Sequence, residues 1–390
     1  MKPSVKIGSL LLAVMMVFSA LFAAGCTPVS LNQEWSYKTS EQELAIGVYI
    51  YSLNVAYSQA KSYASELEDY DETTDAWLDL EITDDDGDKM VAREWIKEEA
   101  KTMCLSYLVL EEQLKKEGVE VSNDLLATAD EQAKTYWNVG QYADYGYIMP
   151  MSEDLEPYGV SFESFAYCST EYSTKYQALF EGIYYEGGSK AVSDSELEEF
   201  FNENYVDYSY FSVNLYSAST DEAGESVNVA LSEKEAKKLT DELDGYAKDV
   251  NGGKSYDDVI EAYMTANELD TDPSTSNVEQ LENTSMGDEI KEALGELGNN
   301  KATTVQVGSG ESAVYYFIYK RDIKDTTADY LAEEANYDAV IAAMKSEEFD
   351  DYIKELTESL KYEENTSVIN KYDPKMFFVK VEETTAASEE

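Results

Sequence analysis

Histidine, the side chain that most often transfers protons near neutral pH, is absent from this sequence of 390 residues. Its absence excludes Ser-His-Asp and Cys-His triads and histidine-ligated zinc. Carboxylates are plentiful, with 80 Asp and Glu against 29 Lys and Arg, so pairs such as Glu198 and Glu199 do not identify a glycosidase. The net charge of −51 argues against nucleic acid as a partner. We expect no cofactor, and a function that depends on surface contacts rather than on acid–base groups.

An acidic stretch at 84–88 is the strongest candidate for a metal site, because calcium prefers oxygen ligands. If Gly87 occupied the glycine position of an EF-hand, Ile82 would take the first ligand position. Arg93 would then take the position of the bidentate glutamate. Neither side chain binds calcium, so the sequence predicts a solvated loop and no metal site.

The N-terminal segment predicts export. Two lysines, Lys2 and Lys6, precede an uncharged apolar stretch at 7–24, as is typical of a secretory signal peptide. The stretch leads into Ala-Ala-Gly before Cys26, which resembles the bacterial lipobox, although Ala23 stands where that motif usually has leucine. The resemblance implies a lipoprotein signal peptide at 1–25, lipid attachment at Cys26 and a position on the extracytoplasmic face of a bacterial cell membrane. The alternative is a retained anchor helix with an incidental cysteine.

Two further cysteines, Cys104 and Cys168, lie in apolar stretches with helical spacing. In an exported protein they could form one disulfide. Cysteine also behaves as a small hydrophobic residue in a core, and we favour two buried free thiols.

Apolar residues recur every three or four positions through the first half of the chain, which is the spacing of helices that pack on one another. Long helices are expected at about 41–67, 96–114, 122–137 and 161–183, the first opened by a capping box at 40–43. We therefore expect a polar tether at 26–40 and a helical domain at 41–192.

A loop rich in glycine, proline and tyrosine is expected at 140–159. It contains Tyr142, Tyr145, Tyr147 and Met149, which fit no helical stripe. Such a loop is an adaptable surface for unfolded polypeptide segments, so these four residues form a candidate client-binding loop. Most of the other tyrosines fall on helix stripes and are expected in the core.

The character of the sequence changes after residue 188. A capping box at 193–196 opens a short helix, and the aromatic, β-branched run at 207–216 predicts a strand. Further helices are expected at 232–250, after residue 256, at 287–297 and at 327–361, with a loop at 270–283 and closing strands at 303–307 and 313–320. The predicted fold is mainly α with an inserted small α+β domain at 193–325, a C-terminal helix at 326–370 that packs on the helical domain, and a C-terminal segment with a disordered acidic tail at 371–390.

This order of elements resembles the PrsA/SurA-type extracytoplasmic foldases, in which a parvulin-like isomerase module is inserted into a helical, SurA-like chaperone domain. The run at 191–197 resembles the linker that precedes the module in that family. Within the module, Met286, Ile290, Ala293 and Leu297 resemble the parvulin pattern in spacing, with Ile290 in place of the family's phenylalanine.

Active parvulins carry one histidine on the first strand of the module and one on the last. The corresponding positions here are Tyr210, or Phe211 if the register differs by one, and Tyr316. The acidic or cysteine residue at the edge of the parvulin pocket corresponds to Asp270 or Asp272. The resemblance therefore implies a degenerate prolyl pocket with weak or absent peptidyl-prolyl cis-trans isomerase activity.

The sequence thus favours a membrane-anchored foldase or chaperone that binds unfolded or partly folded secreted polypeptides through apolar surfaces. One alternative is a solute-binding lipoprotein of a transporter, which predicts repeated βαβ units in two lobes. The other is a surface interaction protein that uses a parvulin-like scaffold and its acidic charge to attract cationic partners.

Overall fold

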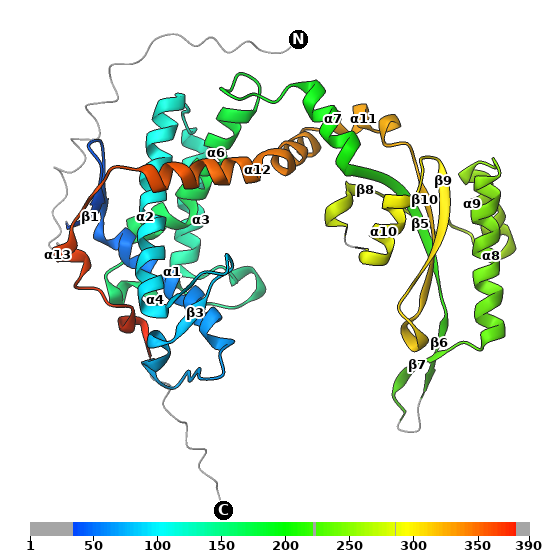
Figure 1. Ribbon diagram of the computed structural model, residues 1–390, viewed down its shortest axis with the longest axis horizontal. Helices are drawn as coiled ribbons and strands as arrows, with labels where there is room; N and C mark the ends of the chain where they lie inside the picture. Colours follow the sequence, from blue (N-terminus) through cyan, green and yellow to red (C-terminus); the bar gives the residue numbers. More distant parts are fainter. Residues whose placement is uncertain (1–33, 221–223, 285, 380–390) are drawn as a thin grey trace, which may run out of the picture. The chain divides into compact units, whose positions relative to one another are not determined.

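The computed structural model describes residues 34–220, 224–284 and 286–379 (Figure 1). The predicted signal peptide, Cys26 and the residues after 379 lie outside the described residues. The chain divides into two compact units. The helical unit reaches to Phe180 and resumes at Tyr352, and the sheet unit is Glu181–Asp351. The sheet unit therefore starts before the predicted boundary at 193 and extends beyond the one at 325.

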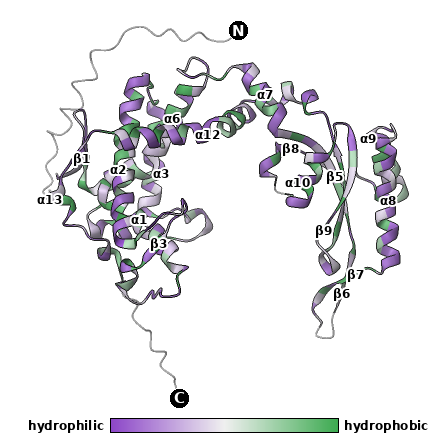
Figure 2. Cartoon of the chain, viewed as in Figure 1, coloured by the Kyte–Doolittle hydropathy of each residue, from purple (hydrophilic) through white to green (hydrophobic). Residues whose placement is uncertain are grey.

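The helical unit contains helices at the four positions that the apolar spacing predicts. They are α1 (Ile46–Ser65), α2 (Ala92–Glu117), α3 (Asn123–Asn138), and α5 (Phe162–Ala166) with α6 (Tyr172–Tyr184), which continues into the sheet unit. The loop predicted at 140–159 is wrong for 151–155, which form the short helix α4 (Met151–Leu155). Hydrophobic and hydrophilic residues alternate along these helices (Figure 2). Their apolar sides form one core that includes Ile50, Leu53, Trp77, Ile96 and Leu108. Helix α2 ends at Gly118, which takes the left-handed conformation that suits glycine.

The start of α1 differs from the prediction. Ser40 is not a helix cap, because Glu43–Ala45 form strand β2 and the helix begins at Ile46. Strand β1 (Trp35–Lys38) pairs antiparallel with β2 and with β11 (Glu363–Glu364). Residues 35–38, inside the range predicted as a tether, are thus a strand that contributes Tyr37 to the core. The backbone pairing satisfies hydrogen bonds that a frayed helical turn would leave open.

The remaining elements of the helical unit are short. The acidic stretch forms the turn of a hairpin between β3 (Glu81–Thr83) and β4 (Lys89–Val91), where Asp84 accepts a hydrogen bond from Trp95. After α12, the helix α13 (Thr366–Ile369) buries Val368 and Ile369 in the core. No helix in 34–220, 224–284 or 286–379 combines the length and the apolar character that crossing a membrane requires.

The sheet unit is built on a four-stranded antiparallel sheet of order β8-β5-β10-β9. The strands are β5 (Tyr205–Asn214), β8 (Thr275–Gln280), β9 (Lys301–Val307) and β10 (Val314–Lys320), and β6 (Tyr216–Thr220) and β7 (Ser226–Ala230) form a separate hairpin. The predicted loop at 270–283 is wrong for 275–280, which pair with β5 as an edge strand. A polar edge strand has little apolar alternation, which is why the sequence pattern missed it.

Helices cover both faces of this sheet (Figure 1). One face carries α8 (Glu233–Asn251) and α9 (Tyr256–Ala266), and the other carries α10 (Asp288–Glu296). The capping box expected at Ser193 is present at the start of α7 (Asp194–Asn204). A second capping box, at Ser232, stands at the start of α8. The long helix expected at 327–361 is interrupted at Glu333 and forms α11 (Thr327–Ala332) and α12 (Glu334–Ser359). The end of α12 belongs to the helical unit, where the Tyr352 hydroxyl donates to Gln113 over 2.8 Å.

Candidate functional site

The candidate prolyl pocket lies on the sheet face that α10 covers. Because side chains alternate along a strand, Val206, Tyr208 and Tyr210 of β5 share this face. Tyr316 and Ile318 of β10 lie beside them. We call this surface, together with the α10 residues that pack on it, the tyrosine face.

The structure brings four of the predicted pocket residues together here. The Tyr210 and Tyr316 rings lie 6.0 Å apart at 51°, at the positions where the resemblance places the two histidines. Ile290, a residue of α10, is fully buried against the sheet, and Met286 packs at the partly exposed edge of the same cluster. Their arrangement gives an aromatic and aliphatic surface with no histidine.

A polar edge of this face was missed by the sequence reasoning. The Tyr208 hydroxyl donates to Glu279 Oε1 over 2.5 Å, and the Thr284 hydroxyl donates to the same oxygen over 2.6 Å. Asn277 Nδ2 donates to the Tyr208 oxygen over 3.2 Å. Burial, together with the hydrogen bond to Glu279, raises the pKa of Tyr208 to about 12. Recognising 275–280 as a strand would have placed Asn277 and Glu279 on this face by alternation.

Two predicted pocket residues lie elsewhere. Phe211 points to the opposite face of the sheet, where its ring stacks on Phe317 at 4.9 Å. Its neighbour Tyr210 occupies the tyrosine face, so the one-residue uncertainty in register is resolved in favour of Tyr210. Asp270 lies on the side of the sheet that carries α9, as does Asp272. The carboxylate at the edge of the tyrosine face is therefore Glu279.

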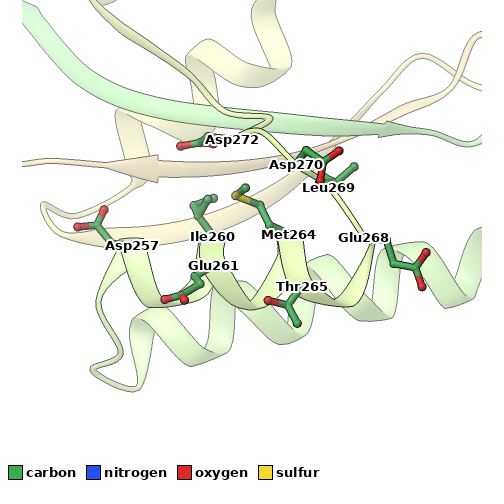
Figure 3. A pocket seen from close by; sticks show the side chains of 9 residues that line it. All are labelled: Asp257, Ile260, Glu261, Met264, Thr265, Glu268, Leu269, Asp270 and Asp272. Carbon is green, nitrogen blue, oxygen red and sulfur yellow. The ribbon is translucent and has the colours of Figure 1, made fainter.

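Asp270 and Asp272 line a groove of about 570 Å³ beside α9, which we call the α9 groove. Ser255 caps the N-terminus of α9 by accepting a hydrogen bond from Asp258 N. The chain reverses after the helix at Glu268, whose φ is +52°, and Leu269 N donates to Met264 O over 2.9 Å. In Figure 3 the Ile260 and Met264 side chains lie on the side of α9 that faces the returning loop.

The candidate client-binding loop connects α3 with α4. Tyr142 is 50% exposed, and three side chains that follow it are more exposed still: Tyr145 79%, Tyr147 65% and Met149 61%. Ile148, which the prediction did not include, is 62% exposed. We call residues 140–150 the aromatic loop.

Backbone contacts at the base of the aromatic loop explain why its side chains point outward. Met149 N donates to Val139 O over 2.9 Å and closes the base. Gly140, at φ +94°, lies so close to Met149 that an added Cβ would stand 2.3 Å from the Met149 carbonyl oxygen. A side chain at position 140 would therefore force the base apart. With the base filled by backbone, the large side chains have no interior to enter.

The two remaining described cysteines are free and buried. Burial raises the pKa of the Cys104 thiol to about 12 and also raises the pKa of Cys168. A thiol with a raised pKa is a poor nucleophile at neutral pH, so both act as core residues. The preference for free thiols over a disulfide is confirmed.

Searches of protein-family models and of curated proteins find no match. A search of solved structures finds the foldase protein PrsA from Streptococcus pneumoniae, at 11% identity, with 77% of this chain and 100% of that chain covered and a TM-score of 0.27. It also finds PrsA from Bacillus subtilis, at 15% identity, with 73% of this chain and 94% of that chain covered and a TM-score of 0.23. Both are foldases of the type that the sequence resembles. At these TM-scores the similarity decides neither fold nor function, which have to be argued from the residues of this chain.

Proposed function

We propose that this protein is an extracytoplasmic foldase or chaperone that binds unfolded secreted polypeptides through apolar surfaces. The observation that carries the proposal is the aromatic loop. It presents five large side chains, all at least half exposed, within eight residues: Tyr142, Tyr145, Tyr147, Ile148 and Met149. A contiguous exposed apolar patch on a soluble unit marks a binding surface.

The residue types in the aromatic loop suit clients of many sequences. Tyrosine offers a large apolar ring and a hydroxyl that keeps the free loop soluble. Methionine is flexible and polarisable, so that it adapts to differently shaped side chains. Surfaces of this composition bind promiscuously, as a chaperone for many secreted chains must.

The tyrosine face supports a second, weaker role in prolyl isomerisation. Rotation about the prolyl bond breaks no covalent bond, and its barrier of about 20 kcal/mol comes from amide resonance. An apolar surface that removes water from the imide lowers this barrier without proton transfer. Tyr210 and Tyr316 supply such a surface, but they offer no imidazole. We therefore propose isomerase activity that is weak or absent.

Membrane anchoring completes the proposal. Lipid attached to Cys26 would hold the chain on the outer face of the cell membrane, where secreted polypeptides emerge unfolded. The net charge of −51 keeps the chain soluble and away from anionic headgroups. Mass spectrometry of the native N-terminus tests the anchor, because an acylated Cys26 has a larger mass than the free residue.

Light scattering from several aggregating clients tests the chaperone activity. The informative variant replaces Tyr142, Tyr145 and Tyr147 with serine. Loss of three rings at about 1 kcal/mol each weakens client binding about 100-fold. The matched control replaces the same three residues with phenylalanine, which keeps the rings, and should suppress aggregation as the native chain does. Native protein that leaves every client's aggregation unchanged would contradict the proposal.

The other two functions have less support. Every strand pair between residues 34 and 379 that the structure describes is antiparallel, whereas a two-lobed solute-binding protein requires parallel βαβ units. A dedicated surface interaction protein would bind one basic partner in a salt-dependent way. A chaperone would instead bind many clients, so the range of bound clients distinguishes these two functions.

A further inference from the structure

The α9 groove combines an apolar floor with a mouth that stays open. Ile260 is 4% exposed and packs in the core with α8, while Met264 lies at the edge of that core. Leu269 lines the other side of the groove and is 38% exposed, so its side chain is accessible to a ligand. The volume of about 570 Å³ lies in the range of ligand sites and accommodates a few side chains.

Carboxylates surround this floor. Asp257 stands at the start of α9, and Asp270 and Asp272 stand on the loop that returns to β8 (Figure 3). Glu261 and Glu268 extend the acidic border. None of these five carboxylates forms an ion pair with a lysine or arginine of the described residues. The groove therefore attracts cations while its floor attracts apolar groups.

The spacing of the carboxylates argues against a single metal ion. In the part of the chain that the structure describes, no three acidic, cysteine or histidine side chains are arranged to hold a metal. Charges distributed around an apolar floor instead match a ligand with several separated cations and an apolar centre. Among polypeptides, that is a segment in which lysine or arginine flanks one or two large apolar side chains.

We propose that the α9 groove binds basic, amphipathic polypeptide segments, with an apolar side chain on Ile260, Met264 and Leu269 and flanking basic side chains against the carboxylates. This proposal rests on the chaperone function and names a class of client segment. The aromatic loop binds through apolar contact alone, so the two surfaces would recognise different segments of unfolded chains.

Fluorescence anisotropy of a labelled peptide tests this proposal on the full mature chain. The probe is an eight-residue peptide with a central Leu-Phe pair flanked by three lysines on each side. We expect saturable binding that weakens as salt is raised, because salt screens the attraction between the lysines and the carboxylates. The variant D257N/D270N/D272N should weaken binding at least tenfold. The control E198Q/E199Q/E203Q removes the same charge from the exposed side of α7 and should have little effect.

Two further measurements make the result decisive. Leu269→Ser alters the floor at an exposed position, so the chain should fold normally and bind the probe severalfold more weakly. A peptide with serine in place of the Leu-Phe pair should bind much more weakly than the probe. Equal loss in the two charge variants, equal binding of the two peptides, or displacement of the probe by micromolar calcium would each overturn the proposal.

The chaperone function can fail independently of the groove. The serine variant of the aromatic loop should lose aggregation suppression and keep its affinity for the basic probe. If the probe binds while no client is protected, the groove is a peptide site and the chaperone proposal is wrong. If clients are protected and the probe does not bind, only the assignment of the groove is wrong.

Discussion

Alkaline pH should unfold the helical unit steeply, because its core contains tyrosines that cannot ionise in place. Four of them are at most 8% exposed: Tyr37, Tyr49, Tyr57 and Tyr107. Burial raises the pKa of Tyr57 to about 12 and raises the pKa of the other three further. In the unfolded chain each ionises near pH 10.

Proton linkage gives the sign and the size of this change in stability with pH. Below pH 10 both states keep these protons, and the stability is fully present. Above pH 10 the unfolded state releases four protons that the folded state retains, so the free energy of unfolding falls with rising pH. Each retained proton contributes about 1.4 kcal/mol per pH unit, and four give about 5.5 kcal/mol per unit. Between pH 11 and 12 this loss reaches about 5–11 kcal/mol, which is comparable with the 5–15 kcal/mol that stabilises a typical domain.

Urea unfolding followed by circular dichroism at pH 9.0, 10.5 and 11.0 measures this slope. Tyr57→Phe keeps the ring contacts with Trp77 and Phe377, at 5.1 and 5.6 Å, and removes one proton from the balance. The slope of the variant should be smaller by about a quarter. A chain whose tyrosines all ionise near pH 10, seen as tyrosinate absorbance, while its circular dichroism stays native would refute this reasoning.

Three further predictions concern the sheet unit. Ile290→Ala should lower the free energy of unfolding in urea by about 2–5 kcal/mol, because it leaves a cavity at a fully buried site under α10. Arg321→Ala should cost about 3–5 kcal/mol in the same assay, because it leaves buried Asp207 without the 2.8 Å ion pair, and Arg321→Lys should recover part of the loss. The double variant Tyr210→His/Tyr316→His should raise the kcat/KM for isomerisation of a proline peptide severalfold above the native value. An unchanged or lower value would show that the aromatic pair is not a degenerate isomerase site.

Much of the fold was predictable because local signals agree with the tertiary structure. Ser193 caps the helix that its spacing to glutamate predicts. The strand prediction at 207–216 is confirmed within two residues, because its aromatic and β-branched residues are buried. The short strands were not predictable in this way. Residues 43–45 have a helix-like pattern but form a strand, because they pair with β1. The sequence of the segment itself gives no sign of this partner.

The candidate site was predictable only in part. Met286 and Ile290 were chosen because they resemble the parvulin pattern, and they lie in one cluster with Tyr210 and Tyr316. Tyr210 and Phe211 could not be distinguished, because adjacent aromatic residues give no alternation from which to read the face. The position of Glu279 could not be predicted, because only one residue of its strand, Val278, is apolar and the sequence pattern does not indicate a strand. Its carboxylate acquires a role only where the fold places Tyr208 within 2.5 Å.

The absence of histidine has a consequence for the whole chain. Carboxylates ordinarily titrate below pH 5 and tyrosines above pH 9, and a sequence without histidine has no side chain with an ordinary pKa between them except cysteine. The described cysteines are buried, and their pKa values are raised. Client binding between pH 6 and 9 should therefore depend on salt and change little with pH, and a binding affinity that varies severalfold over this range would contradict this reasoning.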